Sequence, residues 1–180
     1  MGASRVPHAE RTPMLIVLAG LPGTGKSSIA RMLAAELGAV WLRVDSIEQA
    51  LRESGDLADS DPGKSGYLAA YALAYDNLRV GRIVIGDSVN PLMLTRNAWR
   101  DAGIRTGVHV TEIEIFCSDA AEHRRRIESR RTDVPGLVLP DWQAVINRDY
   151  EPWTREPLRI DTAGRSIADC VETIRAGLPT

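Results

Sequence analysis

Short apolar runs alternate with amphipathic segments along most of the chain. The first run, Met14–Ala19, is apolar at every position, as a strand is when both faces of its sheet are covered. The next segment, 26–37, places Ile29 and Leu33 on one helical stripe, and Gly38 follows it where a helix commonly ends. This alternation predicts strands joined by helices, and therefore a parallel sheet with right-handed crossovers.

The pattern predicts five strands and seven helices. The expected strands are 14–19, 40–44, 82–85, 108–117 and 158–160. The expected helices are 26–37, 46–53, 67–80, 91–102, 119–131, 141–150 and 166–176, with polar loops at 55–66 and 132–140. Together they predict one three-layer α/β domain over residues 14–178, with a parallel five-stranded sheet between helices. Residues 1–13 contain no apolar core and are expected to form a flexible tail, not a signal peptide.

Composition limits the classes of partner that the protein is expected to bind. The 180 residues carry a net charge of −2, so no global field attracts nucleic acid or an anionic membrane. No apolar run approaches the roughly 18 residues of a membrane span. Cys117 and Cys170 form no C-x-x-C motif, which favours reduced thiols in a cytoplasmic protein. No zinc or calcium signature occurs, and the sequence predicts no particular oligomeric state.

The stretch Gly20-Leu-Pro-Gly-Thr-Gly-Lys-Ser27 fits the pattern G-x-x-x-x-G-K-S/T between an expected strand and an expected helix. Its glycines expose successive backbone N–H groups, and the helix that follows points its positive end at an anion. Lys26 is expected to reach the β- and γ-phosphates of ATP, and the hydroxyl of Ser27 to bind Mg²⁺. The predicted nucleotide-binding residues here are Gly20, Pro22, Gly23, Thr24, Gly25, Lys26, Ser27 and Ser28.

A phosphate-binding loop alone does not separate kinases from switches and motors. A guanine-nucleotide switch usually carries N-K-x-D and D-x-x-G, and neither motif is present. A motor ATPase needs a larger protein than this chain. The size of the chain and a late arginine-rich helix therefore favour a small kinase with a P-loop NTPase fold.

Two aspartates follow expected strands. Ligands of open α/β sheets bind beyond the carboxyl ends of the strands, so Asp45 and Asp87 are expected to face the site. Asp45 is predicted to accept the proton of an acceptor hydroxyl, and Asp87 to hold Mg²⁺. The two roles could be exchanged, and either carboxylate could instead cap a helix or a turn.

Four segments together resemble a known group of enzymes: "GLPGTGKSS", "VDSIEQAL", "RIVIGDSV" and "RRRIESRR". In order and spacing they are similar to the small AAA-type P-loop kinases of the zeta-toxin, chloramphenicol phosphotransferase and polynucleotide kinase group. The resemblance implies ATP-dependent phosphorylation of a hydroxyl, with Asp45 as the base. Polynucleotide kinases typically carry an arginine three residues after that aspartate, and the position here is Glu48, which counts against a nucleic-acid substrate.

The arginine-rich helix resembles the lid of adenylate-kinase-like enzymes. Arg126 and Arg130 are four residues apart and are expected to share one helical face. The resemblance implies that Arg126 lies near the adenine and that Arg130 meets the transferring phosphate, while Thr162 and Gly164 border the adenine. The same arginines could also form a solvated basic face or contact RNA.

The resulting hypothesis is an ATP- and Mg²⁺-dependent kinase that phosphorylates a hydroxyl of a small molecule. Lys26, Asp45 and Arg130 are its predicted catalytic residues, and Ser27 and Asp87 its metal ligands. The alternatives are a polynucleotide 5′-hydroxyl kinase and an ATP-binding regulator without catalysis. No motif identifies the acceptor.

The roles of three tyrosines and of one arginine are not decided by the sequence. The helical stripe of Tyr67, Tyr71 and Tyr75 suits core packing or one wall of an acceptor pocket. Arg96 is expected to be a surface charge, or else to bind an anionic acceptor.

Overall fold

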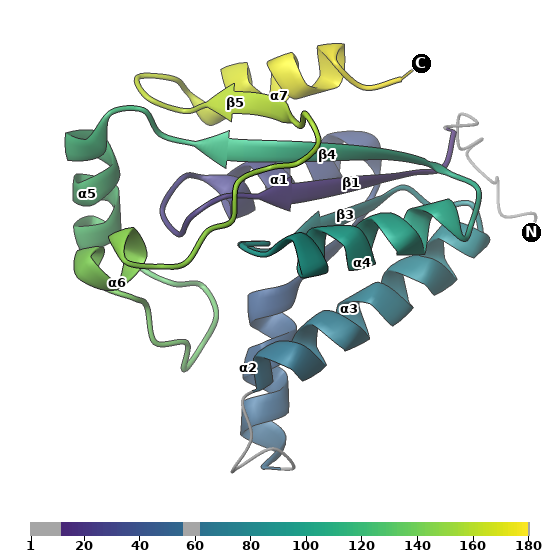
Figure 1. The fold of residues 1–180 in the computed structure, drawn as a ribbon, viewed down its shortest axis with the longest axis horizontal. Helices are drawn as coiled ribbons and strands as arrows, with labels where there is room; N and C mark the ends of the chain where they lie inside the picture. Colours follow the sequence, from purple (N-terminus) through teal and green to yellow (C-terminus); the bar gives the residue numbers. More distant parts are fainter. Residues whose placement is uncertain (1–11, 56–61, 180) are drawn as a thin grey trace, which may run out of the picture.

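A five-stranded parallel sheet forms the centre of the computed structural model, which describes residues 12–55 and 62–179. Its strands lie in the order β2-β3-β1-β4-β5, and every neighbouring pair is parallel (Figure 1). The strands are β1 (Met14–Ala19), β2 (Val40–Arg43), β3 (Val84–Asp87), β4 (His109–Phe116) and β5 (Leu158–Asp161). The predicted parallel α/β architecture is therefore confirmed.

Helices cover both faces of the sheet (Figure 1). They are α1 (Lys26–Leu37), α2 (Val44–Ser54), α3 (Pro62–Arg79), α4 (Met93–Ile104), α5 (Ala120–Ser129), α6 (Trp142–Ile146) and α7 (Ile167–Ala176). Since side chains alternate along β1, Ile16 and Leu18 pack on the side of α1 and α7, whereas Leu15 and Val17 pack on the side of α3 and α4. The fold thus has two apolar cores, one on each face of the sheet.

Several predicted boundaries were wrong by a few residues. The strand expected to reach residue 44 ends at Arg43, and α3 begins at Pro62 instead of residue 67. Proline suits the first position of a helix because its missing N–H has no partner there. Part of the predicted loop 55–66, residues 56–61, lies outside the described residues, as does most of the tail predicted for residues 1–13.

The predicted helix 141–150 is much shorter than expected. It ends at Ile146, and residues 147–157 run without helix or strand to the start of β5. The side chains and backbone of this segment bond to β4 and to the start of α4, which a continued helix would not allow.

The carboxyl ends of the strands all point toward α5 and α6 (Figure 1). The loop between β1 and α1, the start of α2 and the end of β3 therefore meet at one edge of the sheet. No helix in the described part of the chain is long and apolar enough to cross a membrane.

Candidate active site

The loop between β1 and α1 has a backbone that only glycine tolerates at key positions. Gly20, Gly23 and Gly25 have φ angles of 137°, 81° and 98°. A Cβ atom on Gly20 would lie 2.0 Å from the carbonyl oxygen of Ile115 in β4. The glycine spacing of the motif thus reflects both backbone conformation and close contact with the sheet.

The loop closes on itself through two side chains. The Lys26 ammonium and the Thr24 hydroxyl donate hydrogen bonds to the carbonyl oxygen of Leu21, at 2.8 and 2.9 Å. The residue before α1 is Gly25, which offers no side-chain cap to the first N–H groups of the helix. These N–H groups are therefore available to an anion at the positive end of the helix.

Two distant residues support the loop from outside. The Nε2 atom of His123 donates to the carbonyl oxygen of Pro22 at 2.8 Å. The hydroxyl of Thr162 lies 3.1 Å from the carbonyl oxygen of Thr24. No role could be assigned to His123 from the sequence, because no local pattern pairs it with a loop 101 residues away.

The electrostatics of Lys26 depend on burial and on surrounding charges. Burial lowers its pKa to about 8, although the carboxylates of Asp87 and Asp45 favour the charged amine. The guanidinium groups of Arg130 and Arg148 lower this pKa further. All four charged groups therefore lie within electrostatic reach of one ammonium.

Asp87 is the last residue of β3 and is buried. Burial raises the pKa of its carboxyl, and the ammonium of Lys26 acts in the opposite direction. The indole N–H of Trp41 donates to its Oδ2 atom at 3.1 Å, and a hydrogen bond with the side chain of Ser27 also lowers its pKa. Among the described residues no backbone N–H donates to this carboxylate, so it caps no turn there and faces the phosphate loop.

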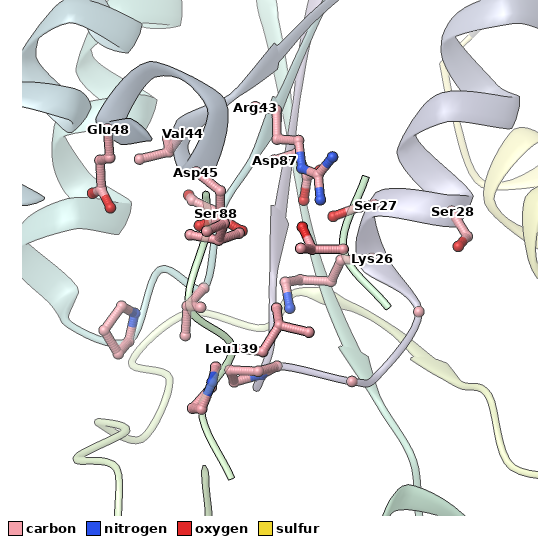
Figure 2. Close-up of a pocket in the computed structure, with 18 of the residues that line it drawn as sticks. Lys26, Ser27, Ser28, Arg43, Val44, Asp45, Glu48, Asp87, Ser88 and Leu139 are labelled. Carbon is pink, nitrogen blue, oxygen red and sulfur yellow. The ribbon is translucent and has the colours of Figure 1, made fainter. Parts of the chain in front are cut away.

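Ser27 and Asp87 fit a magnesium site. The described residues contain no group of three or more His, Cys, Asp or Glu side chains that could hold a metal ion. Mg²⁺ in phosphate sites, however, needs only one or two protein oxygens besides the phosphates and water. The hydroxyl of Ser27 and the carboxylate of Asp87 are such a pair of oxygens, and Figure 2 shows them on the same side of the cleft.

Asp45 lies in the first turn of α2 and not at the end of a strand, which corrects the prediction. The residue that precedes the helix is Arg43, and no side chain caps this end, so the capping alternative for Asp45 is also wrong. The side chain of Asp45 is half-buried and faces the same space as Lys26 and Asp87 (Figure 2).

Arg126 joins α5 to the loop after β5. Its Nη1 and Nη2 atoms donate to the hydroxyl and carbonyl oxygens of Thr162, at 2.8 and 2.9 Å. Glu122 pairs with Arg126 and accepts a hydrogen bond from the N–H of Gly164 at 3.0 Å. The structure thus brings together Arg126, Thr162 and Gly164, the three residues predicted for the adenine side.

Arg130 does not share a helical face with Arg126. It follows the last residue of α5 with extended backbone angles, φ −67° and ψ 147°, so the prediction of a common face was wrong. Its side chain nevertheless lines the cleft, and its buried Nε and Nη2 atoms have no hydrogen-bond partner among the described residues. Burial lowers the pKa of Arg130, and the charge of Asp45 raises it.

A single cleft of about 1580 Å³ connects these groups. One end lies against α5 and the start of α7, and the other lies between α2, α3 and α4. The second end combines apolar and aromatic side chains with the charged Glu48, Arg52 and Lys64. Its lining includes Val44, Tyr67, Leu68, Tyr71, Leu92, Leu94, Ala98, Val138 and Leu139.

The tyrosine stripe divides between two environments. Tyr67 and Tyr71 line the cleft, and their hydroxyls bond to the backbone N–H of Asn90 and the carbonyl oxygen of Thr95. Tyr75 lies outside the cleft, where the guanidinium of Arg105 stacks on its ring. Tyr67 and Tyr71 thus line the cleft and also pack against the core on the α3 side of the sheet, and their role toward an acceptor stays a prediction.

Arg96 is fully buried in α4, so the expectation of a surface charge was wrong. It also does not line the cleft. Its Nε atom donates to the carbonyl oxygen of Asn90 at 2.9 Å, between β3 and α4.

Three other residues of the cleft were missed from the sequence. Arg43 lines the cleft and pairs with Asp133, in the loop after α5, at 2.6 Å. Trp41 contacts Asp87, and Arg148 lies within electrostatic reach of Lys26. Their contacts span large sequence separations that no local pattern encodes.

Comparison with known proteins shows which protein family the chain belongs to. A family model for the AAA domain matches residues 15–148. Uncharacterized proteins of Mycobacterium tuberculosis and Mycobacterium bovis are 27% identical to the chain over 192 residues. The match covers 99% of this chain and 38% of each relative, so the chain spans well under half of their length.

Solved structures share the fold at low sequence identity. A protein of Chloroflexus aurantiacus matches with a TM-score of 0.70 and 22% identity, over 94% of this chain and all of that one. The APS kinase of Mycobacterium tuberculosis, in complex with AMPPNP and APS, matches with a TM-score of 0.67 and 20% identity, over 92% and 96%. Chaetomium thermophilum Kti12, in complex with ADP-AlF3, has the same TM-score and 19% identity, over 92% and 100%.

Proposed function

Because the chain belongs to the AAA domain family, we propose that it is an ATP- and Mg²⁺-dependent kinase that phosphorylates a hydroxyl of a small molecule. One observation carries the proposal. Lys26, Asp45, Asp87 and Arg130, from four different segments, line one cleft beside a phosphate-binding loop. Phosphoryl transfer requires groups that bind the phosphates and the metal, orient the acceptor and stabilise the charge of the transferred phosphoryl group, and this set can supply all of them.

The nucleotide would bind with its phosphates on the N–H groups of residues 20–26 and its base toward Arg126 and Thr162. Lys26 would bind the terminal phosphates, and Ser27 and Asp87 would hold the metal ion that neutralises them. The relatives solved with AMPPNP and with ADP-AlF3 support nucleotide binding by this fold.

Asp45 would orient the acceptor hydroxyl and take its proton, because it faces the phosphate site from the acceptor side. Arg130 would stabilise the charge that develops on the transferred group, since its side chain lines the cleft and its Nε and Nη2 atoms have no hydrogen-bond partner among the described residues. The acceptor itself would lie between α2, α3 and α4.

The decisive experiment measures ATP consumption with Mg²⁺ against a panel of hydroxyl acceptors. The panel contains sugars, nucleosides, aminoglycosides, phenicols and 5′-hydroxyl oligonucleotides. We expect one small molecule to stimulate ATP consumption and to appear phosphorylated by mass spectrometry. Stimulation by oligonucleotides alone would instead support the polynucleotide kinase.

The variant Asp45→Asn tests the mechanism. It should lower phosphoryl transfer at least about 100-fold, because general-base catalysis contributes that much, and leave ATP affinity unchanged. The matched control is Glu53→Gln on the same helix, which is exposed and outside the cleft, and should retain full activity. An Asp45→Asn variant as active as the wild type would remove Asp45 from catalysis. ATP binding without transfer to any acceptor would favour the regulator.

A further inference from the structure

Residues 147–157, called the strap below, form an irregular segment that is tied to the scaffold at Glu151 and at Arg155. The N–H of Glu151 donates to the carbonyl oxygen of Pro91 at 2.8 Å, and its carboxylate accepts from the N–H of Met93 at 2.5 Å. Further along, the guanidinium of Arg155 forms two hydrogen bonds with Glu112 of β4, at 2.7 and 2.9 Å. The strap is therefore fixed and not a free loop.

Arg96 of α4 lies at the centre of these contacts. Its guanidinium lies 4.2 Å from the ring centre of Trp153 and 4.8 Å from that of Tyr150, both on the strap. It donates to the carbonyl oxygens of Asn90, Pro91 and Pro152, and it forms no ion pair among the described residues. A buried cation without a carboxylate is costly, so the rings and carbonyl oxygens must stabilise it in one position.

The hydrogen bonds that begin at Arg96 extend through Asn90 to the phosphate loop. Asn90, which accepts from Arg96, donates through its side chain to the carbonyl oxygen of Leu18 at 2.8 Å. The neighbouring Val89 accepts a hydrogen bond from the N–H of Gly20. Among the described residues, Asn90 is the one non-glycine residue with positive φ, at 46°, a conformation that neighbouring contacts must maintain. Arg96 thus connects the strap to the segment that carries the phosphate loop.

The strap brings one more arginine to the cleft. Arg148 lines the cleft together with Lys26 and Arg130, and its side chain has no hydrogen bond or ion pair among the described residues. Its guanidinium lies within electrostatic reach of the ammonium of Lys26. The ammonium of Lys26 is bonded to the carbonyl oxygen of Leu21, whereas Arg148 has no such partner in the described part of the chain, and two cations around one space suit an anion bound between them.

We propose that Arg148 binds the terminal phosphate of the nucleotide opposite Lys26, and that Arg96 is the positioning residue that fixes the strap for this contact. The inference rests on the nucleotide site of the proposed function. Arginine suits this place because its planar fork forms paired hydrogen bonds with phosphate oxygens.

The test uses the full chain and isothermal titration calorimetry with AMPPNP, ADP and AMP in the presence of Mg²⁺. Arg148→Ala should weaken AMPPNP binding about 10- to 100-fold, the range for a hydrogen bond between charged groups, and leave AMP binding unchanged. Arg148→Lys should recover part of the loss, because it restores the charge without the fork. Equal AMPPNP affinity in Arg148→Ala and the wild type would overturn the proposal.

Arg96→Met should reproduce the selective loss of AMPPNP affinity, and the double variant with Arg148→Ala should lose no more than Arg148→Ala alone. The matched control is Arg105→Met at the end of the same helix, which removes an arginine stacked on Tyr75 and touches no strap residue. A folded Arg96→Met protein with an unchanged ratio of AMPPNP to AMP affinity would make Arg96 merely structural and overturn its positioning role.

Glu151→Ala provides a second way to loosen the strap, since it removes an exposed anchor and leaves the buried ring contacts intact. It should also lower AMPPNP affinity selectively. If Arg96→Met does not fold, this variant tests whether an anchored strap is needed for AMPPNP binding. A wild-type protein that binds none of the three nucleotides would contradict the proposed function itself. Normal wild-type binding with insensitive variants would contradict this inference alone.

Discussion

Gly20 is the residue at which the phosphate loop leaves the sheet, and its backbone leaves no room for a side chain. Gly20→Ala should lower the free energy of unfolding by about 3 kcal/mol or more, because a new Cβ meets a backbone carbonyl at a strained φ. Thermal unfolding followed by circular dichroism measures this loss. Gly107→Ala is the control: its φ of 73° is also positive, but open space surrounds it, so only about 1–2 kcal/mol of backbone strain is expected. Equal losses for the two variants would contradict the steric argument.

Lys26 should link nucleotide binding to proton uptake. Bound phosphates favour the charged amine and raise its pKa above about 8, so binding takes up protons between that value and the higher one. ATP affinity should therefore be greatest below pH 8 and fall as the pH rises through it. Calorimetry at pH 8.5 in two buffers with different ionisation enthalpies measures the uptake, and titrations at pH 7 are the reference. Identical heats in both buffers at pH 8.5 would refute the linkage.

At the residue scale, the sequence predicted the site residues that form a contiguous motif, but not those whose partners are distant along the chain. The phosphate loop could be predicted because its glycines, lysine and serine are contiguous. His123 and Arg43 escaped notice because their partners are 101 and 90 residues away. Arg96 was misjudged because two rings and several carbonyl oxygens stabilise its charge, and none of these forms a motif with it.

At the scale of elements, the loop from Thr132 to Pro140 lines the cleft and is joined to β2 by an ion pair. Arg43 of β2 meets Asp133 of this loop at 2.6 Å, and the guanidinium keeps the pKa of Asp133 low. Leu137, Val138 and Leu139 of the same loop line the cleft. The ion pair therefore connects the edge of the sheet to a covering segment.

Asp133→Asn should loosen this loop without unfolding the protein. Backbone amides of residues 132–140 should exchange hydrogen faster, whereas the free energy of unfolding should change by about 1 kcal/mol, because Asp133 is exposed although Arg43 is mostly covered. Hydrogen–deuterium exchange with mass spectrometry measures the first quantity, and Asp76→Asn on α3 is the exposed control. Unaltered exchange in the loop would show that other contacts hold it.

Element types were predictable and some element ends were not. Periodicity gave the five strands and seven helices of the described residues, because most of these elements carry a repeating apolar pattern. The predicted helix at 141–150 failed beyond Ile146, since Glu112 and Glu114 of β4 bond to the segment and draw it into an irregular path. Contacts between strands and distant segments thus decided where this helix stops.

At the scale of the whole molecule, the alternation of strands and helices was enough to predict a parallel sheet, but not its strand order. The order β2-β3-β1-β4-β5 places β1 at the centre, so its loop is enclosed by neighbours from both sides. Asp87 of β3 lies next to Leu18 of β1 in register, which explains why a carboxylate 61 residues after Lys26 reaches its ammonium. The extent of the domain, residues 14–178, stays a prediction.

Nucleotide binding should stabilise the entire fold, because the phosphate loop contacts β3, α5 and the loop after β5. With ATP and Mg²⁺ at 100 times the dissociation constant, the gain is about 2.7 kcal/mol, or roughly 5–10 °C in Tm for a domain of this size. Thermal unfolding with and without ATP measures it, with Mg²⁺ alone as the control. The shift should disappear in Lys26→Ala. Saturating ATP without any shift would contradict binding to the folded state.

The hydrogen bond between Trp41 and Asp87 gives the site an optical property. Emission from an indole depends on the electric field at its ring, and this ring donates its N–H directly to the carboxylate proposed to hold Mg²⁺. The chain has three other tryptophans, Trp99, Trp142 and Trp153, and none of them contacts Asp87 by a hydrogen bond. A variant that keeps Trp41 alone would therefore report metal loading as a change in intrinsic fluorescence, without any added dye.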